Sequence, residues 1–460
     1  MSSRVAVVGG GLAGLVTAFR LRDARPDLAI SLYESSSTLG GKIRTTPFMG
    51  RQVDEGPDAF LTRVPWAVDL TRELGITDRV VSPSTGSAYV VVKGRMRRLP
   101  EGLALGVPVR FWPLLTSGIV SPPAALRAGL DLVRGDDWPG GDESVGGLIR
   151  RRLGPQIHER LVDPLIGSIY AGRTEHLDLQ LIAPQLETAA RRNRSLIRGL
   201  RAQRRAGSTA DGPIFHGFRN GMAQLVDALV SRLRGVEIRT GTRVETLRRA
   251  HPGVELTTTD GTDTFDAVVL AAPAHAASPM VAGASPAASE LMGGIPFASV
   301  TLVTMGLRRS DVGHRLDGSG ALIPAQEGWL STAASWGSSK WPHWADDDRV
   351  VLRVSSGRDG DDRAMGLDDD VLVDFLLQEM ATLLDIRGEL LEWRVSRWPR
   401  SFAQYRPGHG RLVTEIEAQL RRDLPGLFVT GASYRGIGIP AVVRQAGETT
   451  TAVLDHLRVP

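Results

Sequence analysis

The sequence contains no cysteine, which excludes disulfide bonds, thiolate metal sites and redox chemistry at a protein thiol. Lysine occurs only at Lys42, Lys93 and Lys340, so arginine carries most of the positive charge behind the net charge of +4. No run of about 18 apolar residues is present, which argues against a membrane-spanning helix. The chain enters a β-branched segment without the pattern of a signal peptide, so we expect a cytoplasmic protein. Any redox chemistry must come from a bound cofactor.

The strongest chemical signal lies in the first glycine-rich stretch. Val5 to Val8 is a short β-branched run typical of a buried parallel strand, and an apolar segment at helical spacing follows from Leu15. Gly9, Gly11 and Gly14 between them match G-x-G-x-x-G, in which glycine permits the turn, the approach of a pyrophosphate and close helix packing. Because a helix N-terminus presents unpaired N–H groups, this arrangement predicts a dinucleotide site.

Two further features favour FAD over a nicotinamide cofactor. The next predicted strand, 29–33, ends in Glu34, where a carboxylate can accept hydrogen bonds from both ribose hydroxyls and would repel the 2′-phosphate of NADP. A second glycine pair, Gly40 and Gly41, then precedes Lys42. A nicotinamide dehydrogenase has no need of this second loop, whereas a protein that buries a whole FAD needs more backbone around the pyrophosphate.

The pattern of predicted strands and helices changes several times along the chain, and its 460 residues are too many for one simple core. We predict an α/β fold, α+β overall, with a Rossmann-like FAD-binding domain, a mixed-sheet substrate domain and a helical insertion. The predicted FAD-binding segments are 1–85, 211–274 and 396–460. The predicted substrate sheet comprises 86–99 and 275–395, and the helical insertion is 100–210. Within these segments we expect a hairpin over 89–99, one helix over 182–200 and a closing helix over 441–457.

Seven arginines cluster in the predicted insertion: Arg191, Arg192, Arg194, Arg198, Arg201, Arg204 and Arg205. A solvated helix face is one interpretation; an anionic membrane surface, a polyanionic substrate and an acidic partner protein are the others. No aromatic residues interleave with these arginines, so we expect no nucleic acid partner.

Taken together, the chain resembles the amine-oxidase-like FAD superfamily and, more closely, the porphyrinogen oxidases of heme biosynthesis, over nearly its whole length. The superfamily resemblance rests on the two glycine loops and Glu34. The closer resemblance rests on the segments 54–61, 142–154, 163–172 and 430–440. It implies an FAD-binding domain of the amine-oxidase and glutathione-reductase type.

The resemblance also implies which residues surround FAD: Gly9, Gly10, Gly11, Leu12, Ala13, Gly14, Glu34, Ser35, Gly41, Lys42, Gly56, Pro57, Asp58, Val244, Trp398, Gly431, Ile437, Gly438 and Ile439. This chain departs from the superfamily at Ala432, where many members have an acidic residue, and at Ala441 and Val442, where relatives often carry Asp-Cys. We expect backbone N–H groups to hold the ribityl-pyrophosphate without that acidic residue.

The function implied by the resemblance is oxidation of coproporphyrinogen III by six electrons, with dioxygen as acceptor and hydrogen peroxide as product. Because the oxidised intermediates tautomerise toward aromaticity by themselves, no catalytic acid or base is expected. Arg63, Tyr170 and Lys340 are the predicted substrate contacts. His158, His176 and His409 have no metal-ligand spacing, so no metal is expected.

Alternatives remain at this point. Protoporphyrinogen IX is the alternative substrate, and a flavin amine oxidase or a non-catalytic flavin-binding or heme-chaperone protein would share the FAD motifs. The arginine excess and the missing hydrophobic anchor favour the substrate with four propionates. Expected contacts beyond the substrate and dioxygen are the next heme-pathway enzyme or a membrane surface, with peripheral membrane association.

Overall fold

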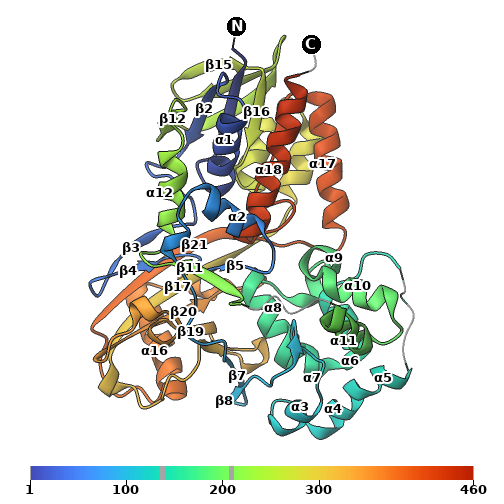
Figure 1. The fold of residues 1–460 in the computed structure, drawn as a ribbon, viewed down its shortest axis with the longest axis vertical. Helices are drawn as coiled ribbons and strands as arrows, with labels where there is room; N and C mark the ends of the chain where they lie inside the picture. Colours follow the sequence, from blue (N-terminus) through green and yellow to red (C-terminus); the bar gives the residue numbers. More distant parts are fainter. Residues whose placement is uncertain (1, 135–137, 139, 207–211, 459–460) are drawn as a thin grey trace. The chain divides into compact units, whose positions relative to one another are not determined.

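The computed structural model describes residues 2–134, 138, 140–206 and 212–458. The chain forms two compact units. Unit 1 comprises 1–81, 214–296 and 409–460, and unit 2 comprises 82–213 and 297–408. The five sequence segments proposed above stay a prediction, and each unit is described by itself (Figure 1).

Unit 1 is built on a five-stranded parallel sheet with the order β12-β2-β1-β16-β22. The strand β1 lies at its centre, and Val5, Val7 and Ala6 are fully buried there because both faces of a parallel sheet are covered. The strands are β12 (Glu237–Thr240), β2 (Ala29–Glu34), β1 (Arg4–Val8), β16 (Ala267–Leu270) and β22 (Leu427–Val429). Since the carboxyl ends of parallel strands meet at one edge, the loops after β1, β2, β16 and β22 gather there.

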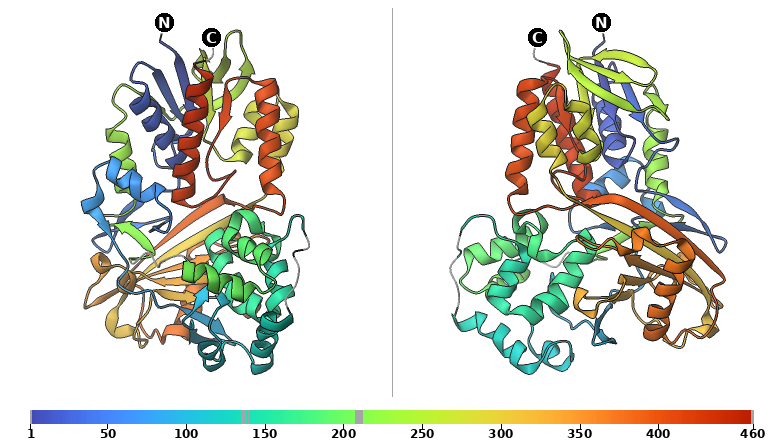
Figure 2. Two further views of the ribbon diagram at one scale, coloured as in Figure 1. Left: turned by 45° about the vertical axis from the view of Figure 1, so that its right-hand side comes forward. Right: turned by 180° about the vertical axis from the view of Figure 1, so that it is seen from behind.

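Two long helices of unit 1, α1 (Leu12–Ala24) and α18 (Ile439–His456), pack side by side (Figures 1 and 2). Their apolar residues share one core with the sheet and with α12 (Ala223–Ser231). The other helices of unit 1 are α2 (Trp66–Glu73), α13 (Ala274–Val281), α14 (Pro286–Gly293) and α17 (His409–Asp423). Its remaining strands are β3 (Thr45–Phe48), β4 (Arg51–Asp54), β5 (Phe60–Leu61), β6 (Val80–Val81), β11 (Phe215–Phe218), β13 (Val244–Arg249), β14 (Val254–Thr258) and β15 (Gly261–Phe265).

Unit 2 contains a seven-stranded sheet with the order β21-β17-β20-β19-β18-β7-β8. Its strands are β7 (Tyr89–Val92), β8 (Arg95–Arg98), β17 (Phe297–Arg308), β18 (Gly320–Leu322), β19 (Ser331–Trp336), β20 (Arg349–Ser356) and β21 (Glu392–Ala403). The helix α16 (Asp369–Leu384) packs its apolar face into the core of this sheet. The pairing of β7 with β8 confirms the hairpin predicted over 89–99, with Lys93 and Gly94 at positive φ in its turn.

The described residues of the 100–206 segment are mostly helical and carry one short hairpin, β9 (Leu103–Ala104) with β10 (Val107–Pro108). Its helices are α3 (Trp112–Thr116), α4 (Pro122–Gly129), α5 (Asp131–Arg134), α6 (Val145–Leu153), α7 (Pro155–Ile157), α8 (Asp163–Tyr170), α9 (Leu179–Ile182), α10 (Pro184–Arg192) and α11 (Leu196–Ala206). A π-helical turn, His158–Val162, joins α7 to α8. No helix in the described part of the chain is long and apolar enough to span a membrane.

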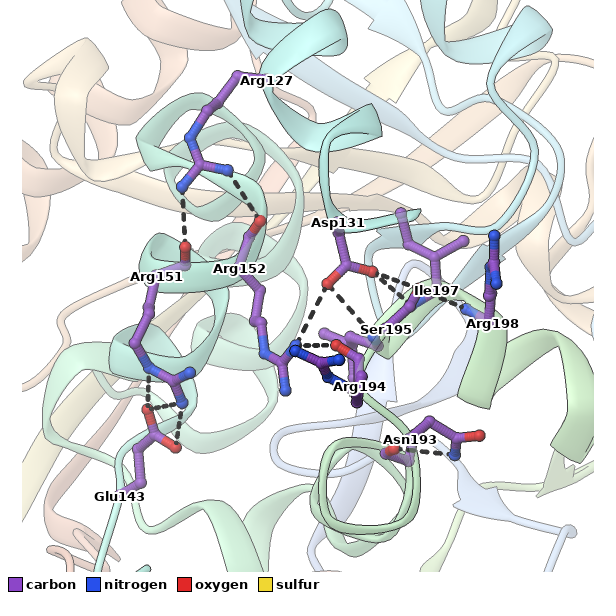
Figure 3. Close-up of polar contacts among 12 residues, drawn as sticks. Arg127, Asp131, Glu143, Arg151, Arg152, Asn193, Arg194, Ser195, Ile197 and Arg198 are labelled. Atoms are coloured by element: carbon purple, nitrogen blue, oxygen red, sulfur yellow. Dashed lines mark hydrogen bonds and ion pairs between the residues drawn. The ribbon is translucent and has the colours of Figure 1, made fainter. Parts of the chain in front are cut away.

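The single helix predicted over 182–200 is wrong: α10 ends at Arg192, and a buried carboxylate caps a second helix, α11, that begins at Leu196. Asp131 accepts hydrogen bonds from Ser195 Oγ at 2.8 Å and from Ile197 N at 3.0 Å, and so caps the N-terminus of α11 (Figure 3). Arg152 approaches the same carboxylate at 3.6 Å and is almost fully buried with it. Tertiary contacts from a distant segment therefore override the local helical pattern.

Candidate functional site

The first glycine loop leaves no room for side chains. A Cβ at Gly14 would lie 1.9 Å from the carbonyl oxygen of Gly9, so α1 can pack on the turn only with glycine there. Gly9 has a φ of +113°, and a Cβ on it would lie 3.0 Å from the Ala271 carbonyl carbon. Gly11 is the N-cap of α1 and offers no side-chain cap, so the first N–H groups of the helix stay available to a ligand.

The second glycine loop closes over the first. Gly40 and Gly11 form an isolated parallel bridge, and Gly40 N donates to Gly10 O at 2.8 Å. A Cβ at Gly41 would lie 3.2 Å from the Gly11 Cα, so the two backbones approach closely. The sequence predicted these two loops at one site, and the structure brings them together.

Glu34 ends β2 beside both loops. Its Oε2 accepts from Gly10 N at 2.7 Å, and its Oε1 accepts from Ser36 N at 2.8 Å and from Ser35 Oγ at 3.3 Å. Because each carboxylate oxygen has two lone-pair sites, the side chain keeps acceptor capacity for ribose hydroxyls. Thr242 N donates to Glu34 O at 3.0 Å, which places the turn before Val244 at the same strand end.

The C-terminal motif, 430–440, packs against the first turn of α1. Gly431, after β22, has a φ of +110°, and a Cβ there would lie 3.4 Å from the Ala13 Cβ on the first turn of α1. Gly438 is the N-cap of α18 and, like Gly11, provides no side-chain cap. Ile437, Gly438 and Ile439 therefore lie at a second uncapped helix start in unit 1.

Side chains of unit 1 hold this C-terminal turn in place. His409 Nε2 lies 3.0 Å from Tyr434 O, and Ser433 Oγ accepts from Ala274 N at 2.9 Å. Gln445 Oε1 accepts from Arg435 N at 3.0 Å, and its Nε2 donates to Gly436 O. Sequence reasoning missed these supports, because each joins segments that are separated along the chain or bonds only to backbone.

The Gly56-Pro57-Asp58 turn lies between β4 and β5, in the same unit as both glycine loops. Asp54 ends the strand that leads into this turn, and its Oδ1 accepts hydrogen bonds from Met222 N at 2.8 Å and from Thr45 Oγ1 at 2.6 Å. Asp54 therefore serves as a cap at the start of α12.

The predicted substrate contacts come from both units. Arg63 is exposed in unit 1, between β5 and α2. Tyr170 ends α8 in unit 2, where burial raises the pKa of its phenol to about 12. Lys340 ends α15 (Gly337–Lys340) with its Nζ 5.1 Å from the centre of the Trp341 ring. Trp398, a predicted flavin contact, lies on β21 in unit 2. The roles of these residues stay predictions.

The sequence analysis did not identify one group of potential metal ligands. His158, Asp163 and Glu175 bring ligand atoms within 4.8 Å of one another, from three separate segments. Hydrogen bonds already occupy this cluster: Arg150 Nε donates to His158 Nδ1 at 3.1 Å, and Thr174 Oγ1 lies 2.7 Å from both His158 Nε2 and Asp163 Oδ1. Burial lowers the pKa of His158 and so favours the neutral imidazole, which can accept the hydrogen bond from Arg150 at Nδ1. The expectation of no metal stays a prediction.

The backbone of unit 1 fits a dinucleotide. Two helix N-termini without side-chain caps and glycine surfaces that a Cβ would fill are the features that an anionic pyrophosphate needs. Thr430 adds a buried hydroxyl beside Gly431 that has no hydrogen-bond partner among the described residues. Gly9 to Gly14, Glu34 and Gly41 would hold FAD at its adenosine and pyrophosphate, and Gly431 with 437–439 would meet its ribityl and flavin portions.

Replacing Gly14 by alanine tests this cradle. The new Cβ would collide with the Gly9 carbonyl, so we expect Gly14→Ala to lower flavin affinity by about tenfold or more. The measurement is the visible flavin absorbance per mole of purified protein, with Gly283→Ala as control. A Cβ at Gly283, also in unit 1, meets no atom within 4 Å. Equal flavin content in both variants would contradict the prediction.

Lys42 makes the free energy of unfolding depend on pH. Burial lowers the pKa of its ammonium group from 10.5 to about 8. Between these two values the unfolded chain binds more protons at this residue than the folded chain, so the free energy of unfolding rises with pH from about 8 to about 10.5. We expect urea unfolding of flavin-free protein to show this rise and Lys42→Met to weaken it. An identical pH slope in the variant would refute the assignment.

Comparison with known proteins agrees with this geometry. The sequence profile of the flavin containing amine oxidoreductases matches residues 12–454. Coproporphyrinogen III oxidase of Bacillus subtilis (strain 168) is 31% identical, over 98% of each chain. Coproporphyrinogen III oxidase of Mycobacterium tuberculosis (strain ATCC 25618 / H37Rv) is 33% identical, over 98% of this chain and 97% of that protein. A structure from Exiguobacterium sp. 255-15, named as a protoporphyrinogen oxidase, covers 99% of both chains at 27% identity and a TM-score of 0.89.

These similarities confirm the predicted fold class, the FAD cofactor and the assignment as a flavin-dependent oxidoreductase. The chain belongs to the flavin containing amine oxidoreductase family.

Proposed function

We propose that this chain oxidises coproporphyrinogen III to coproporphyrin III in the cytoplasm, as a step of heme biosynthesis. The observation that carries the proposal is similarity over the full length: relatives named coproporphyrinogen III oxidase cover 98% of this chain at 31% to 33% identity. The glycine cradle of unit 1 supplies the place for the redox cofactor that a chain without cysteine requires.

The reaction removes six electrons and six protons from the four bridging carbons and their pyrrole nitrogens. When bound at the glycine loops of unit 1, FAD would supply hydride acceptance and electron transfer to dioxygen; the six electrons balance against three molecules of dioxygen, which give three of hydrogen peroxide. The protein's own residues bind and orient a flat ring in an apolar site and place cations at its carboxylates. No side chain is assigned as a proton-transfer catalyst.

Arg63, Tyr170 and Lys340 are our proposed substrate contacts. Arg63 follows the Gly56–Asp58 turn, and its exposed guanidinium can pair with a propionate. Arg63→Ala should therefore raise KM for the porphyrinogen while kcat changes little; an unchanged KM would remove this residue from the substrate site.

The surface of the helical segment supports a second element of the proposal, peripheral contact with an anionic membrane. Trp112, Leu126 and Val133 are each more than 70% exposed, on the consecutive helices α3, α4 and α5. The basic helix α11, with Arg198, Arg204 and Arg205 exposed, packs against α5. Asp131, a residue of α5, caps the start of α11 (Figure 3). A segment with both exposed apolar side chains and cations favours an anionic lipid surface over a purely acidic protein partner.

The substrate proposal predicts a preference between two porphyrinogens. Purified flavoprotein is mixed aerobically with coproporphyrinogen III or protoporphyrinogen IX, and porphyrin fluorescence and hydrogen peroxide are followed together. We expect a higher kcat/KM for coproporphyrinogen III because its four propionates give more cation contacts than two. Preference for protoporphyrinogen IX would refute the substrate but keep the chemistry. Activity on neither compound, with oxidation of an amine, would replace the proposal by a flavin amine oxidase.

The membrane proposal predicts binding to lipid vesicles. The protein should sediment with phosphatidylglycerol vesicles at low salt, and both raised salt and Trp112→Ser should weaken this binding. Vesicles of phosphatidylcholine are the control for lipid charge. Equal sedimentation with both lipids, or none with either, would contradict the proposal.

A further inference from the structure

A short loop of unit 2, 357–362, carries three carboxylates, of which Asp359 and Asp361 have cationic partners. Asp361 is held by Arg363, whose Nε and Nη2 donate to its two oxygens at 2.8 Å each. Asp359 is held by Arg406 at 3.0 Å on both oxygens and lies 3.1 Å from His176 Nδ1. Asp361 is therefore bound by a guanidinium through two hydrogen bonds, and Asp359 forms one hydrogen bond and an ion pair with Arg406.

Arg358, which directly precedes Asp359, forms no ion pair with a carboxylate of the described residues. Among the described residues its guanidinium makes one hydrogen bond, at 3.5 Å to Ile323 O, although it can donate five. The side chain is half-buried, and burial lowers the pKa of its guanidinium. Asp163 is the acid with the largest electrostatic effect on Arg358, but its Oδ1 accepts from the N–H and the hydroxyl of Thr174.

A second guanidinium beside Arg358 also lacks an acidic partner. Arg173 donates from Nε to the backbone oxygen of Asp359 at 3.2 Å and forms no ion pair with any described residue. Its positive charge lowers the pKa of Arg358, although the carboxylates of Asp163 and Asp361 act more strongly in the opposite direction. Arg173 is exposed, whereas burial of Arg358 disfavours its charge, and a bound carboxylate would offset that cost.

The position of this pair connects it to the predicted substrate contacts. Asp359 N donates to Ala171 O at 2.8 Å, so the 357–362 loop is tied to the residue that follows Tyr170. Gln404 directly follows β21 and is fully buried, and its Nε2 donates to Tyr170 O at 2.9 Å. A Cβ at Gly167 would lie 2.7 Å from Gly172 O, so the chain after Tyr170 folds tightly back on α8. Arg173 therefore lies three residues after Tyr170, and the backbone of Arg358 is joined to the same turn through its neighbour Asp359.

We propose that Arg358 and Arg173 form a carboxylate-binding subsite that takes one propionate of the porphyrinogen. This inference rests on the proposed function for the identity of the ligand, and on the local geometry for the class of ligand. Arg173 bonds to the backbone of Asp359, the residue after Arg358, and neither arginine forms an ion pair, so each can donate N–H groups to a carboxylate there. Arg363 and Arg406, in contrast, form ion pairs with acids of the loop.

The principal test compares steady-state oxidation of coproporphyrinogen III by the wild-type flavoprotein and by Arg358→Gln. We expect KM to rise by about tenfold with kcat nearly unchanged, because a charge-assisted contact to a non-reacting group is lost. Arg358→Lys, which keeps the charge but not the planar fork, should recover part of the loss, and Arg173→Gln should raise KM in the same direction. Arg387→Gln is the charge-matched control: Arg387 is 78% exposed and paired with Asp385, so its KM should equal that of the wild type.

A binding measurement separates this subsite from a structural role and from turnover. Coproporphyrin III should raise the Tm of wild-type holoenzyme more than that of Arg358→Gln, whereas without porphyrin the variant should melt at or above the wild-type temperature because it lacks a half-buried cation that forms no ion pair. A lower Tm without porphyrin, together with an unchanged porphyrin-induced shift, would show that Arg358 only supports the fold and would overturn the subsite.

The two proposals fail in different ways. If wild-type protein oxidises coproporphyrinogen III but Arg358→Gln has the same KM and the same porphyrin-induced Tm shift, the subsite is wrong and the function stands. If wild-type protein does not oxidise coproporphyrinogen III, the proposed function is wrong. In that case an Arg358-dependent shift with coproporphyrin III would still support a carboxylate site, and its absence would overturn it.

Discussion

The structure of the candidate site depends on one contact that only glycine allows, the approach of the Gly14 Cα to the carbonyl of Gly9. This contact lets α1 start directly above the end of β1 and leaves the first N–H groups of the helix uncovered. The other parts of the cradle are arranged around it. Gly40 pairs with the backbone of the first loop, Glu34 binds the Gly10 amide, and Gly431 packs on Ala13.

The electrostatic character of the protein differs between its two units. In unit 1, the candidate anion site consists of backbone amides and helix ends, and the pKa of Lys42 is lowered by burial. In unit 2, the proposed anion site consists of arginines, and the structure distinguishes those with acidic partners from those without. Arg363 and Arg406 complete local ion pairs, whereas Arg358 and Arg173 do not. This difference would suit a cofactor bound through phosphates and a substrate bound through several carboxylates.

Sequence alone predicted the features that local patterns encode. The strand, turn and helix over 5–24 follow from β-branched residues, three spaced glycines and helical periodicity, and the 89–99 hairpin follows from Lys93-Gly94 between two strands. The break between α10 and α11 could not be predicted in this way, because Asp131 caps the second helix from more than sixty residues away. The unpaired state of Arg358 was equally hidden, since Arg406 and His176 reach Asp359 from distant segments. Patterns of spacing also missed His158, Asp163 and Glu175, which meet only in the folded chain.

The central claim is that the flavin held by this chain takes electrons directly from coproporphyrinogen III. Anaerobic mixing of the purified flavoprotein with coproporphyrinogen III, followed in the visible absorbance of the flavin, tests it most directly. The account predicts that this absorbance is lost on mixing, that porphyrin forms in proportion, and that the absorbance returns when dioxygen is admitted. A flavin absorbance that stays unchanged by the porphyrinogen would contradict the account.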